Sequence, residues 1–159
     1  MLLHFYKMTG AGNDFVMVDN RDQSLSPLLD KDTIEALCDR RFGIGADGLI
    51  AVEPSLGKGG AVRMRYYNAD GGEAEMCGNG ARCFGNFAAA LLHHDKSRPL
   101  PFETMAGVVT ASFEKDGGIT VNLTEPHSLR LFVLNADPVI GADVHFLNTG
   151  VPHAVAFMD

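Results

Sequence analysis

Cys77 is the residue of this sequence that is best suited, by its type and its neighbours, to act as a base or a nucleophile. It lies in the run Met76-Cys77-Gly78-Asn79-Gly80, directly before a long apolar segment that predicts a helix. A cysteine at this place meets the unpaired N–H groups of the first helical turn and the positive end of the helix dipole. Both favour the thiolate, the form of cysteine that takes up a proton or attacks an electrophile. The sequence therefore predicts a reactive thiol at position 77.

The glycines beside this thiol leave room for a small anion. Without side chains at Gly78 and Gly80, a carboxylate can approach the backbone N–H groups closely. Such a carboxylate would bring its α-carbon beside the sulfur of Cys77, which is the geometry needed to remove an α-proton. The side chain of Asn79 could add a hydrogen bond. The same residues are also typical of an ordinary turn before a helix, and their spacing alone leaves both interpretations open.

The sequence positions of the other two cysteines indicate structural roles for both. Cys38 falls on the apolar stripe of a predicted helix, and Cys83 lies inside the apolar segment that follows Cys77. A buried cysteine usually behaves as a small hydrophobic side chain. The odd number of cysteines and the absence of a Cys-x-x-Cys pair argue against a disulfide framework or a zinc site.

Other polar residues are weaker candidates. The turn at 9–14 exposes Asn13, but no Gly-Lys-Ser/Thr follows, which argues against a phosphate loop. His153 follows a Gly-Val-Pro turn, and a lone histidine is more often structural than catalytic. Glu73 and Glu75 are interpreted as solvated loop residues or as acceptors for nearby amides. The carboxylates show no metal-ligand spacing, so no metal site is predicted.

The elements that must position these residues are mostly strands. Residues 78–94 predict an enclosed helix because they are apolar nearly all the way round. A shorter helix is expected to begin with Asp32 as its cap and to end at Gly43. Strands outnumber helices, which disfavours a doubly wound sheet and favours an α+β fold with a barrel-like sheet wrapped round the buried helix. The expected strands cover 2–8, 15–18, 49–52, 62–67, 102–105, 108–113, 119–123, 131–134, 144–148 and 154–157.

The composition of the chain argues against some classes of partner. The chain has 159 residues, of which 46% are hydrophobic and 21% charged, as expected of a globular domain with a real core. The net charge of −7 argues against a nucleic acid as partner, since phosphate binding needs clustered Lys and Arg. No apolar run reaches the about 20 residues that span a bilayer, so no membrane is expected. The first residues lack a signal-peptide pattern, which makes the cytoplasm the default location.

Four segments, in this order, resemble the diaminopimelate epimerase family. They are residues 9–15 (TGAGNDF), 40–49 (RRFGIGADGL), 68–83 (NADGGEAEMCGNGARC) and 148–153 (NTGVPH). The resemblance runs from Met1 to the end of the chain. The Met-Cys-Gly-x-Gly pattern alone is shared with the related proline racemases. Asn13-Asp14-Phe15 and the segment that begins at Asn68 favour the diaminopimelate epimerases.

The resemblance implies an enzyme of two lobes that works without pyridoxal phosphate or a metal. It would interconvert LL- and meso-diaminopimelate on the route to lysine and peptidoglycan. Each lobe would supply one cysteine, and one thiolate would take the α-proton while the opposite thiol returns one. On this basis Cys77 is one of the two cysteines, and His153 lies near the reacting carbon. The substrate-binding residues implied in the same way are Asn13, Asn68, Gly78 and Asn79.

The chain departs from the family in two side chains and in length. Many members have Gln where this chain has Gly48, and Asn where it has Val151, so neither position is assigned. The second lobe, with the second cysteine and the groups that hold the distal amino acid, is missing. Residues 1–159 are therefore expected to be an N-terminal lobe, with an amino-acid substrate and the C-terminal lobe as partners and a homodimer of the full-length protein left open. Alone, the chain is expected to show little or no epimerisation.

Two alternatives remain open at this stage. The chain could belong to a related cofactor-independent racemase or isomerase, resembling the proline racemases, because the groups that select the distal end of the substrate lie outside it. It could also be a non-catalytic binding fragment that keeps the fold. The intact Cys77-Gly78-Asn79-Gly80 run argues against the second alternative, since a binding module does not need a thiol there.

Overall fold

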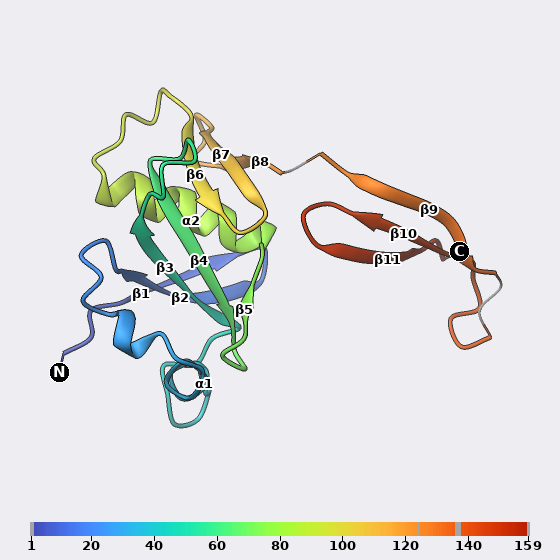
Figure 1. Ribbon diagram of the computed structural model, residues 1–159, viewed down its shortest axis with the longest axis horizontal. Helices are drawn as coiled ribbons and strands as arrows, with labels where there is room; N and C mark the ends of the chain where they lie inside the picture. The colour runs from blue at the N-terminus through green and yellow to red at the C-terminus, as the bar shows by residue number, and fades with distance from the viewer. Residues whose placement is uncertain (1, 124, 136–137, 159) are drawn as a thin grey trace. The chain divides into compact units, whose positions relative to one another are not determined.

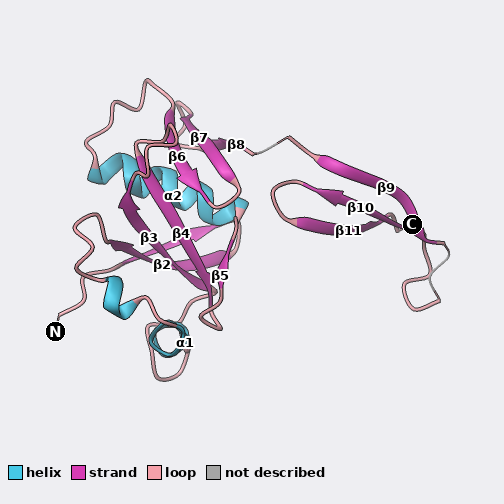
Figure 2. Cartoon of the chain, in the orientation of Figure 1, coloured by secondary structure: helices cyan, strands magenta, loops and turns pink. Residues whose placement is uncertain are grey.

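The chain folds into two compact units. The computed structural model describes residues 2–123, 125–135 and 138–158. The units are Met1–Asn122 and Leu123–Asp159, and each is described by itself. Figure 1 labels their helices and strands, and Figure 2 colours them by type. Within the described residues, the helices are too short or too polar to cross a membrane.

The first unit is one eight-stranded sheet with two α-helices. Its strands are β1 (Tyr6–Gly10), β2 (Asn13–Asp19), β3 (Gly48–Pro54), β4 (Val62–Asn68), β5 (Glu73–Ala74), β6 (Leu100–Thr104), β7 (Gly107–Phe113) and β8 (Ile119–Asn122). They are hydrogen-bonded in the order β1-β2-β3-β4-β6-β7-β8, with β5 paired to β4. The helices are α1 (Lys31–Cys38) and α2 (Gly78–Leu91), and a short 3-10 helix, η1, covers Ser26–Leu28. The β2–β3 and β4–β6 pairs are parallel, so α1 and α2 lie in the two crossover connections.

Helix α2 is enclosed by the sheet, as its apolar sequence predicts. It contacts β1 to β4 and β6 to β8, and Figure 1 shows it lying across the sheet. The ring of its buried Phe84 lies 4.7 Å from that of Phe102 on β6, centroid to centroid. Gly85 brings the helix close to β7, since a Cβ added there would lie 2.6 Å from the Cβ of Ala111. The predicted α+β fold with a curled sheet round a buried helix is confirmed.

Helix α1 covers a second core, on which side chains of β2, β3 and β4 converge. This cluster consists of Val16, Val18, Ile34, Cys38, Ala46, Leu49, Ala51 and Tyr67. Strands β2 and β3 are therefore buried along nearly their whole length, as strands covered on both faces are. β2 begins with Asn13 and β3 follows directly after Asp47, so the burial of these strands fixes the positions of both residues.

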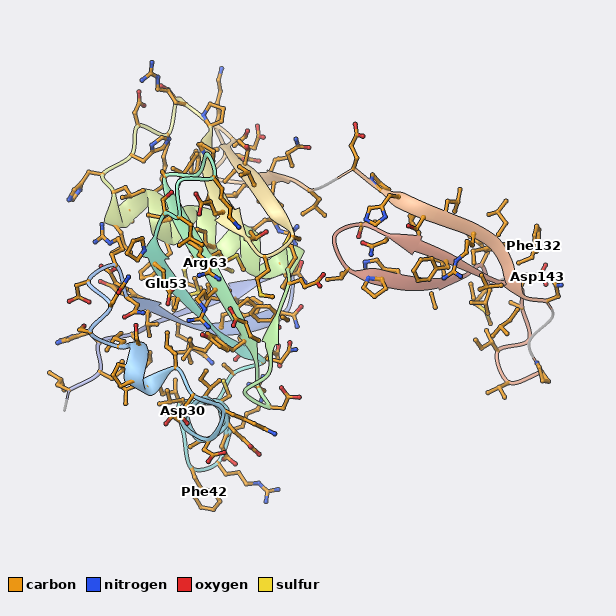
Figure 3. All side chains as sticks on the ribbon, in the orientation of Figure 1. Asp30, Phe42, Glu53, Arg63, Phe132 and Asp143 are labelled. Atoms are coloured by element: carbon orange, nitrogen blue, oxygen red, sulfur yellow. The ribbon has the colours of Figure 1, made fainter. Side chains whose placement is uncertain are left out.

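The predicted ends of α1 are wrong. Asp30, not Asp32, caps the helix, and its Oδ1 accepts a hydrogen bond from the N–H of Thr33 at 3.1 Å. Figure 3 labels Asp30 at this end of α1. The helix stops at Cys38, before the predicted Gly43, because the carboxylate of Asp39 accepts hydrogen bonds from the N–H groups of Arg41 and Phe42, at 2.7 Å each.

The β1–β2 connection is a tight turn of two residues. Gly10 pairs with Asn13, and the residues between them, Ala11 and Gly12, both have positive φ, at 49° and 94°. This is the pattern of a type I′ hairpin turn, whose twist matches that of the strands. The strands thus reach further into the predicted turn than expected and place Asn13 at the start of β2. Gly10 has to be glycine, since a Cβ there would lie 2.6 Å from the carbonyl oxygen of Asn79.

Glu103 is a buried carboxylate on β6 that ties down the β3–β4 turn. Its oxygens accept from the hydroxyl of Ser55 and from the N–H groups of Leu56 and Lys58, all at 2.7 Å. These hydrogen bonds, with that of Ser55 first, lower the pKa of Glu103 to about 2. The side chain therefore remains an acceptor for the turn across the physiological pH range.

The second unit is a separate three-stranded sheet. Its strands β9 (His127–Leu134), β10 (Val144–Asn148) and β11 (Pro152–Ala156) are antiparallel in the order β11-β10-β9. In the described residues these strands pair only with one another, so they form a sheet of their own. β9 begins four residues before its expected start and is exposed throughout. Phe132, labelled in Figure 3, has a φ of 54° and stacks edge-on against His145. The assignment of the whole chain to one lobe stays a prediction.

Candidate active site

Cys77 is the N-cap of α2, as its sequence position predicts. Its backbone is extended, at φ −141° and ψ 115°, and its Sγ accepts a hydrogen bond from the N–H of Gly80 at 3.4 Å. The carbonyl of Cys77 accepts from Ala81 at 2.7 Å, which starts the helical hydrogen bonds. The side chain is half-buried and the thiol is free. The sulfur therefore lies at the positive end of α2 and remains within reach of a ligand.

Two further backbone N–H groups of the first turn of α2 lie at the same end of the helix as the sulfur. Those of Gly78 and Asn79 have no acceptor among the described residues. Gly80 leaves the α2 backbone close to the sheet, since a Cβ there would lie 2.9 Å from Cδ1 of Ile50. The start of α2 thus presents bare amides next to a thiol, an arrangement suited to an anion such as a carboxylate.

A relay of side-chain amides leads from the β1–β2 turn to α2. Nδ2 of Asn13 donates to Asp47 at 3.1 Å, Oδ1 of Asn13 accepts from Nδ2 of Asn79 at 2.7 Å, and Oδ1 of Asn79 accepts from Arg82. A carboxylate only accepts and a guanidinium only donates, so Asp47 and Arg82 together dictate which way both amides face. The predicted substrate-binding residues Asn13 and Asn79 are therefore in direct contact and have fixed orientations.

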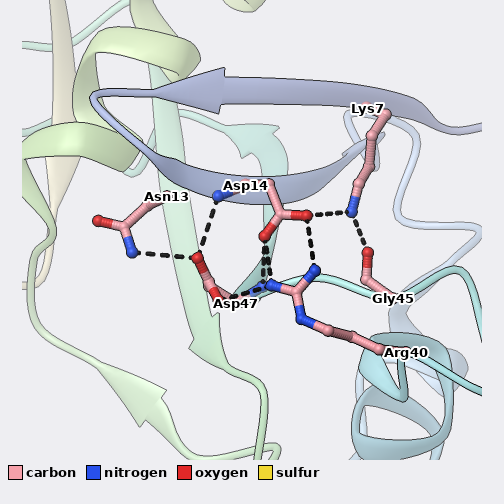
Figure 4. A network of polar contacts seen from close by, with 6 residues as sticks. All are labelled: Lys7, Asn13, Asp14, Arg40, Gly45 and Asp47. Atoms are coloured by element: carbon pink, nitrogen blue, oxygen red, sulfur yellow. Dashed lines mark hydrogen bonds and ion pairs between the residues drawn. The ribbon is translucent and has the colours of Figure 1, made fainter.

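Asp47 is held in turn by a charged network, shown in Figure 4. Nη2 of Arg40 donates at 2.7 Å both to Asp47 and to Asp14, and Nζ of Lys7 donates to Asp14 at 2.8 Å and to the carbonyl of Gly45. The hydrogen bond from Arg40, followed by that from Lys7, holds the pKa of Asp14 well below its usual range. The hydrogen bond from Asn13 is the main cause of the lowered pKa of Asp47. Both carboxylates thus stay ionised and keep the relay in place.

Asn68 ends β4, opposite Gly48 on β3. Its Oδ1 accepts a hydrogen bond from the hydroxyl of Tyr66 at 2.7 Å, and its backbone N–H donates to the carbonyl of Gly72 at 2.9 Å. Burial, followed by electrostatic interaction with Cys77, raises the pKa of Tyr66 to about 12. Tyr66 and Asn68 therefore belong to the same end of the sheet as the thiol.

The remaining polar candidates, Glu73 and His153, lie in different units of the chain. Glu73 lies on β5 and accepts two hydrogen bonds from Arg65, at 2.7 and 2.8 Å, so its partner is a guanidinium and not a nearby amide. His153 lies in the second unit, in the β10–β11 hairpin, and its Nε2 is 3.0 Å from Oγ1 of Thr149. Its role near a reacting carbon stays a prediction. The described residues contain no group of three or more His, Cys, Asp or Glu side chains arranged to hold a metal ion.

Cys38 and Cys83 are both buried, at 3% and 4% exposure. Burial raises the pKa of each thiol, so both stay in the neutral form near neutral pH. Their predicted structural roles fit this placement, Cys38 in the α1 core and Cys83 inside α2.

Sequence reasoning missed the residues that hold the predicted ones. Asp47, Arg40 and Arg82 act through contacts between segments far apart in the sequence, and no local pattern marks them. Tyr66 did leave a signal, because residues two apart on a strand share a face. Its position two before Asn68 on a predicted strand places it on the side of Asn68.

The fold resembles those of a solved proline racemase and of a phenazine biosynthesis protein. The chain is similar to a probable proline racemase from Agrobacterium radiobacter K84, with a TM-score of 0.66 at 15% identity, over 98% of this chain and 52% of that one. It is also similar to a phenazine biosynthesis protein of the PhzF family from Bacillus anthracis, with a TM-score of 0.64 at 18% identity, over 97% of this chain and 54% of that one.

Sequence comparison narrows this resemblance to one family. The family model for diaminopimelate epimerase matches residues 5–129, and the chain belongs to this family. The chloroplastic diaminopimelate epimerase of Oryza sativa subsp. japonica is 44% identical over 124 residues, which cover 78% of this chain and 34% of that protein. The diaminopimelate epimerase of a Synechocystis strain is 40% identical over 173 aligned positions, which cover 100% of this chain and 61% of that protein. The chain thus spans less than two thirds of the length of these relatives.

Proposed function

We propose that this chain carries one half of the active site of an epimerase that interconverts LL- and meso-diaminopimelate. The observation that carries the proposal is the half-buried sulfur of Cys77, hydrogen-bonded to the first turn of α2 beside two N–H groups without an acceptor among the described residues. Membership of the diaminopimelate epimerase family supports this substrate. The pathway would be that of lysine biosynthesis.

The proposed chemistry removes one proton from the α-carbon and returns another to it, with no change in oxidation state. A cysteine thiolate removes the α-hydrogen as a proton, and the electron pair of the C–H bond passes toward the α-carboxylate. A second cysteine thiol, on the opposite face, then donates its proton to the α-carbon. Sulfur ends as thiol on one side and thiolate on the other, and the configuration at carbon is inverted. In this scheme the two thiols suffice, without pyridoxal phosphate or a metal.

The residues around Cys77 have matching tasks in this proposal. The N–H groups of Gly78 and Asn79 would bind the α-carboxylate and stabilise the negative charge that develops on it. The side chains of Asn13, Asn68 and Asn79 would orient the amino acid, and His153 would lie near the reacting carbon.

The second cysteine would come from a segment beyond this chain. Cys38 and Cys83 are buried, and the relatives are longer than the chain. We therefore propose that residues 1–159 form the N-terminal part of a longer enzyme and that they show little or no epimerisation alone. The free thiols support a reducing compartment such as the cytoplasm.

The direct test is uptake of deuterium at the α-carbon of diaminopimelate in D₂O. We expect the full-length wild-type protein to exchange this hydrogen and Cys77→Ser to lose at least about a thousandfold in rate, as loss of an essential nucleophile or base does. Serine is a better replacement than alanine at this position because its hydroxyl can still cap α2. Cys83→Ala serves as a control for removal of a buried thiol. A wild-type protein that leaves the α-hydrogen in place would overturn the epimerase assignment.

A second test needs no substrate. Iodoacetamide labelling followed by mass spectrometry compares the three cysteines within one molecule. We expect Cys77 to be alkylated first near neutral pH, and faster than a free cysteine peptide. Cys38 and Cys83 act as internal controls and should react only on unfolding. Equal rates for Cys77 and the peptide would contradict an activated thiol.

A further inference from the structure

Tyr66 occupies a special place at the end of the sheet nearest to Cys77. It lies on β4 two residues before Asn68, so both side chains are on the same face of the strand. Met64, which precedes them on this face, lies next to the first turn of α2, because its Cε is 3.4 Å from a Cβ built at Gly80. The ring of Tyr66 is half-buried and packs edge-on against Phe15, with centroids 6.0 Å apart.

The neighbouring strand leaves room for this ring. A Cβ at Gly48 would lie 2.8 Å from Cε2 of Tyr66 and 2.4 Å from the carbonyl oxygen of Tyr67. Gly48 is opposite Asn68 in the β3–β4 register. The space beside Asn68 that a side chain on β3 would enter is thus taken by the aromatic ring from β4.

The hydroxyl of Tyr66 contacts the oxygen of the Asn68 amide. It donates to Oδ1 of Asn68 at 2.7 Å. Nδ2 of Asn68 has no acceptor among the described residues. With its pKa raised to about 12, chiefly by burial, Tyr66 stays protonated and remains a donor throughout the neutral range. An asparagine held by its oxygen in this way presents its NH₂ group outward.

We propose that Tyr66 is a positioning residue of this active site, whose hydroxyl holds the Asn68 amide so that its NH₂ group is offered to the amino-acid substrate. This inference rests on the proposed function, because it assigns Asn68 to the substrate. Tyr66 acts through Asn68 and transfers no proton itself. It supplies from β4 an aromatic support that Gly48 on β3 cannot provide.

The test compares two single-atom deletions on adjacent residues of β4. Tyr66→Phe removes the hydroxyl that contacts Asn68, whereas Tyr67→Phe removes a buried hydroxyl that has no hydrogen-bond partner in the part of the chain that the structure describes. In the full-length protein we expect Tyr66→Phe to raise the KM for diaminopimelate roughly threefold to tenfold, the effect of one hydrogen bond, with kcat within about twofold. Tyr67→Phe should leave both constants unchanged. Equal constants for the two variants would overturn the proposal.

Two further readouts separate positioning from other roles. In an Asn68→Ala background, Tyr66→Phe should cause no further change in KM, because the two residues act as one unit. An additive effect would contradict action through Asn68. The pH profile of kcat/KM in Tyr66→Phe should keep the shape of the wild-type profile. Loss of one limb would identify Tyr66 as an acid or base and refute the positioning role.

A readout without catalysis keeps this proposal apart from the epimerase assignment. With asparagine labelled in ¹⁵N, the side-chain NH₂ resonances of Asn68 can be assigned by their loss in Asn68→Asp. We expect Tyr66→Phe to shift them and Tyr67→Phe to leave them in place. If wild-type protein fails to exchange the α-hydrogen, the epimerase assignment fails, and these resonances still decide the contact. Unmoved resonances in Tyr66→Phe would refute it.

Discussion

The closest approach of α2 to the sheet, at Gly85, gives a quantitative test of the fold. A methyl group added by Gly85→Ala would lie 2.6 Å from the Cβ of Ala111 on β7 and 3.8 Å from Cγ2 of Ile119. Carbon atoms in contact are normally about 3.5–4.0 Å apart. Helix and strand therefore have to separate by about 1 Å. Because Gly85 and Ala111 are both buried, the new methyl group cannot move toward solvent to relieve the strain.

The net effect is a difference between two contributions. Overpacking of a core costs about 1–3 kcal/mol, while replacing glycine by alanine within a helix contributes about 1 kcal/mol of stability. We expect Gly85→Ala to lower the free energy of unfolding by about 1 kcal/mol, which corresponds to a fall in Tm of about 2–4 °C for a chain of this size. Urea titration and calorimetry of the chain measure both quantities.

Two matched variants separate these contributions. Ala90 is exposed on the same helix, so Ala90→Gly measures the helix-propensity difference without any change in packing. Ala111→Gly removes the methyl group that the new Cβ meets, and in the double variant the clash should disappear. We expect the double variant to be more stable than the sum of the single changes predicts, by about 1 kcal/mol. Additivity within about 0.5 kcal/mol, or a Gly85→Ala chain more stable than wild type, would refute this reasoning.

Three further predictions follow from other described contacts. Ala11 has a left-handed backbone in a type I′ turn, so Ala11→Asn should raise the free energy of unfolding by about 0.5–1 kcal/mol, whereas Gly12→Ala, at φ 94°, should lower it; a hairpin indifferent to both would contradict the turn type. Tyr67 carries a buried hydroxyl without a partner among the described residues. Tyr67→Phe should therefore leave the free energy of unfolding, measured by urea titration, unchanged or raise it by up to about 1 kcal/mol, and a clear loss would reveal a missing contact. The pKa of Glu103 falls from its ordinary 4.5 to about 2. Its contribution to the free energy of unfolding is therefore complete above pH 4.5 and is lost as the pH falls toward 2. The urea midpoint should fall less over this range in Glu103→Gln than in the wild type, and equal acid sensitivity of the two would contradict the role of this carboxylate.

The sequence predicted the parts of the site that depend on local pattern. An apolar run interrupted by few polar residues indicated the enclosed α2, and the position of Cys77 before it indicated the N-cap. The ends of α1 were predicted less well because Asp30 and Asp32 both precede a helical pattern at cap spacing. Only the fold decides which carboxylate meets a free N–H group. The Asp39 side chain likewise ends the helix through hydrogen bonds that no residue pattern announces.

The groups that orient the site residues could not be predicted because they act between distant segments. Asp47 meets Asn13 only after β2 and β3 pair in parallel across the α1 crossover. Arg82 meets Asn79 by helical spacing, but its effect on Asn13 requires the β1–β2 turn to lie against α2. The pairing of the final strands could not be predicted for a related reason, since strand propensity says where a strand occurs and not which sheet it joins.

The buried carboxylate of Glu103 also has a consequence for the order in which the chain folds. Its partners in the β3–β4 turn, Ser55 and Lys58, precede it by 48 and 45 residues, and the whole α2 crossover lies between them. The turn therefore cannot acquire its final hydrogen bonds when β3 and β4 first meet as a hairpin, but only after β6 has added to the far side of β4. A contact between residues so distant in sequence is slow to form. Amide hydrogens of the turn should thus gain protection late in refolding, together with those of β6.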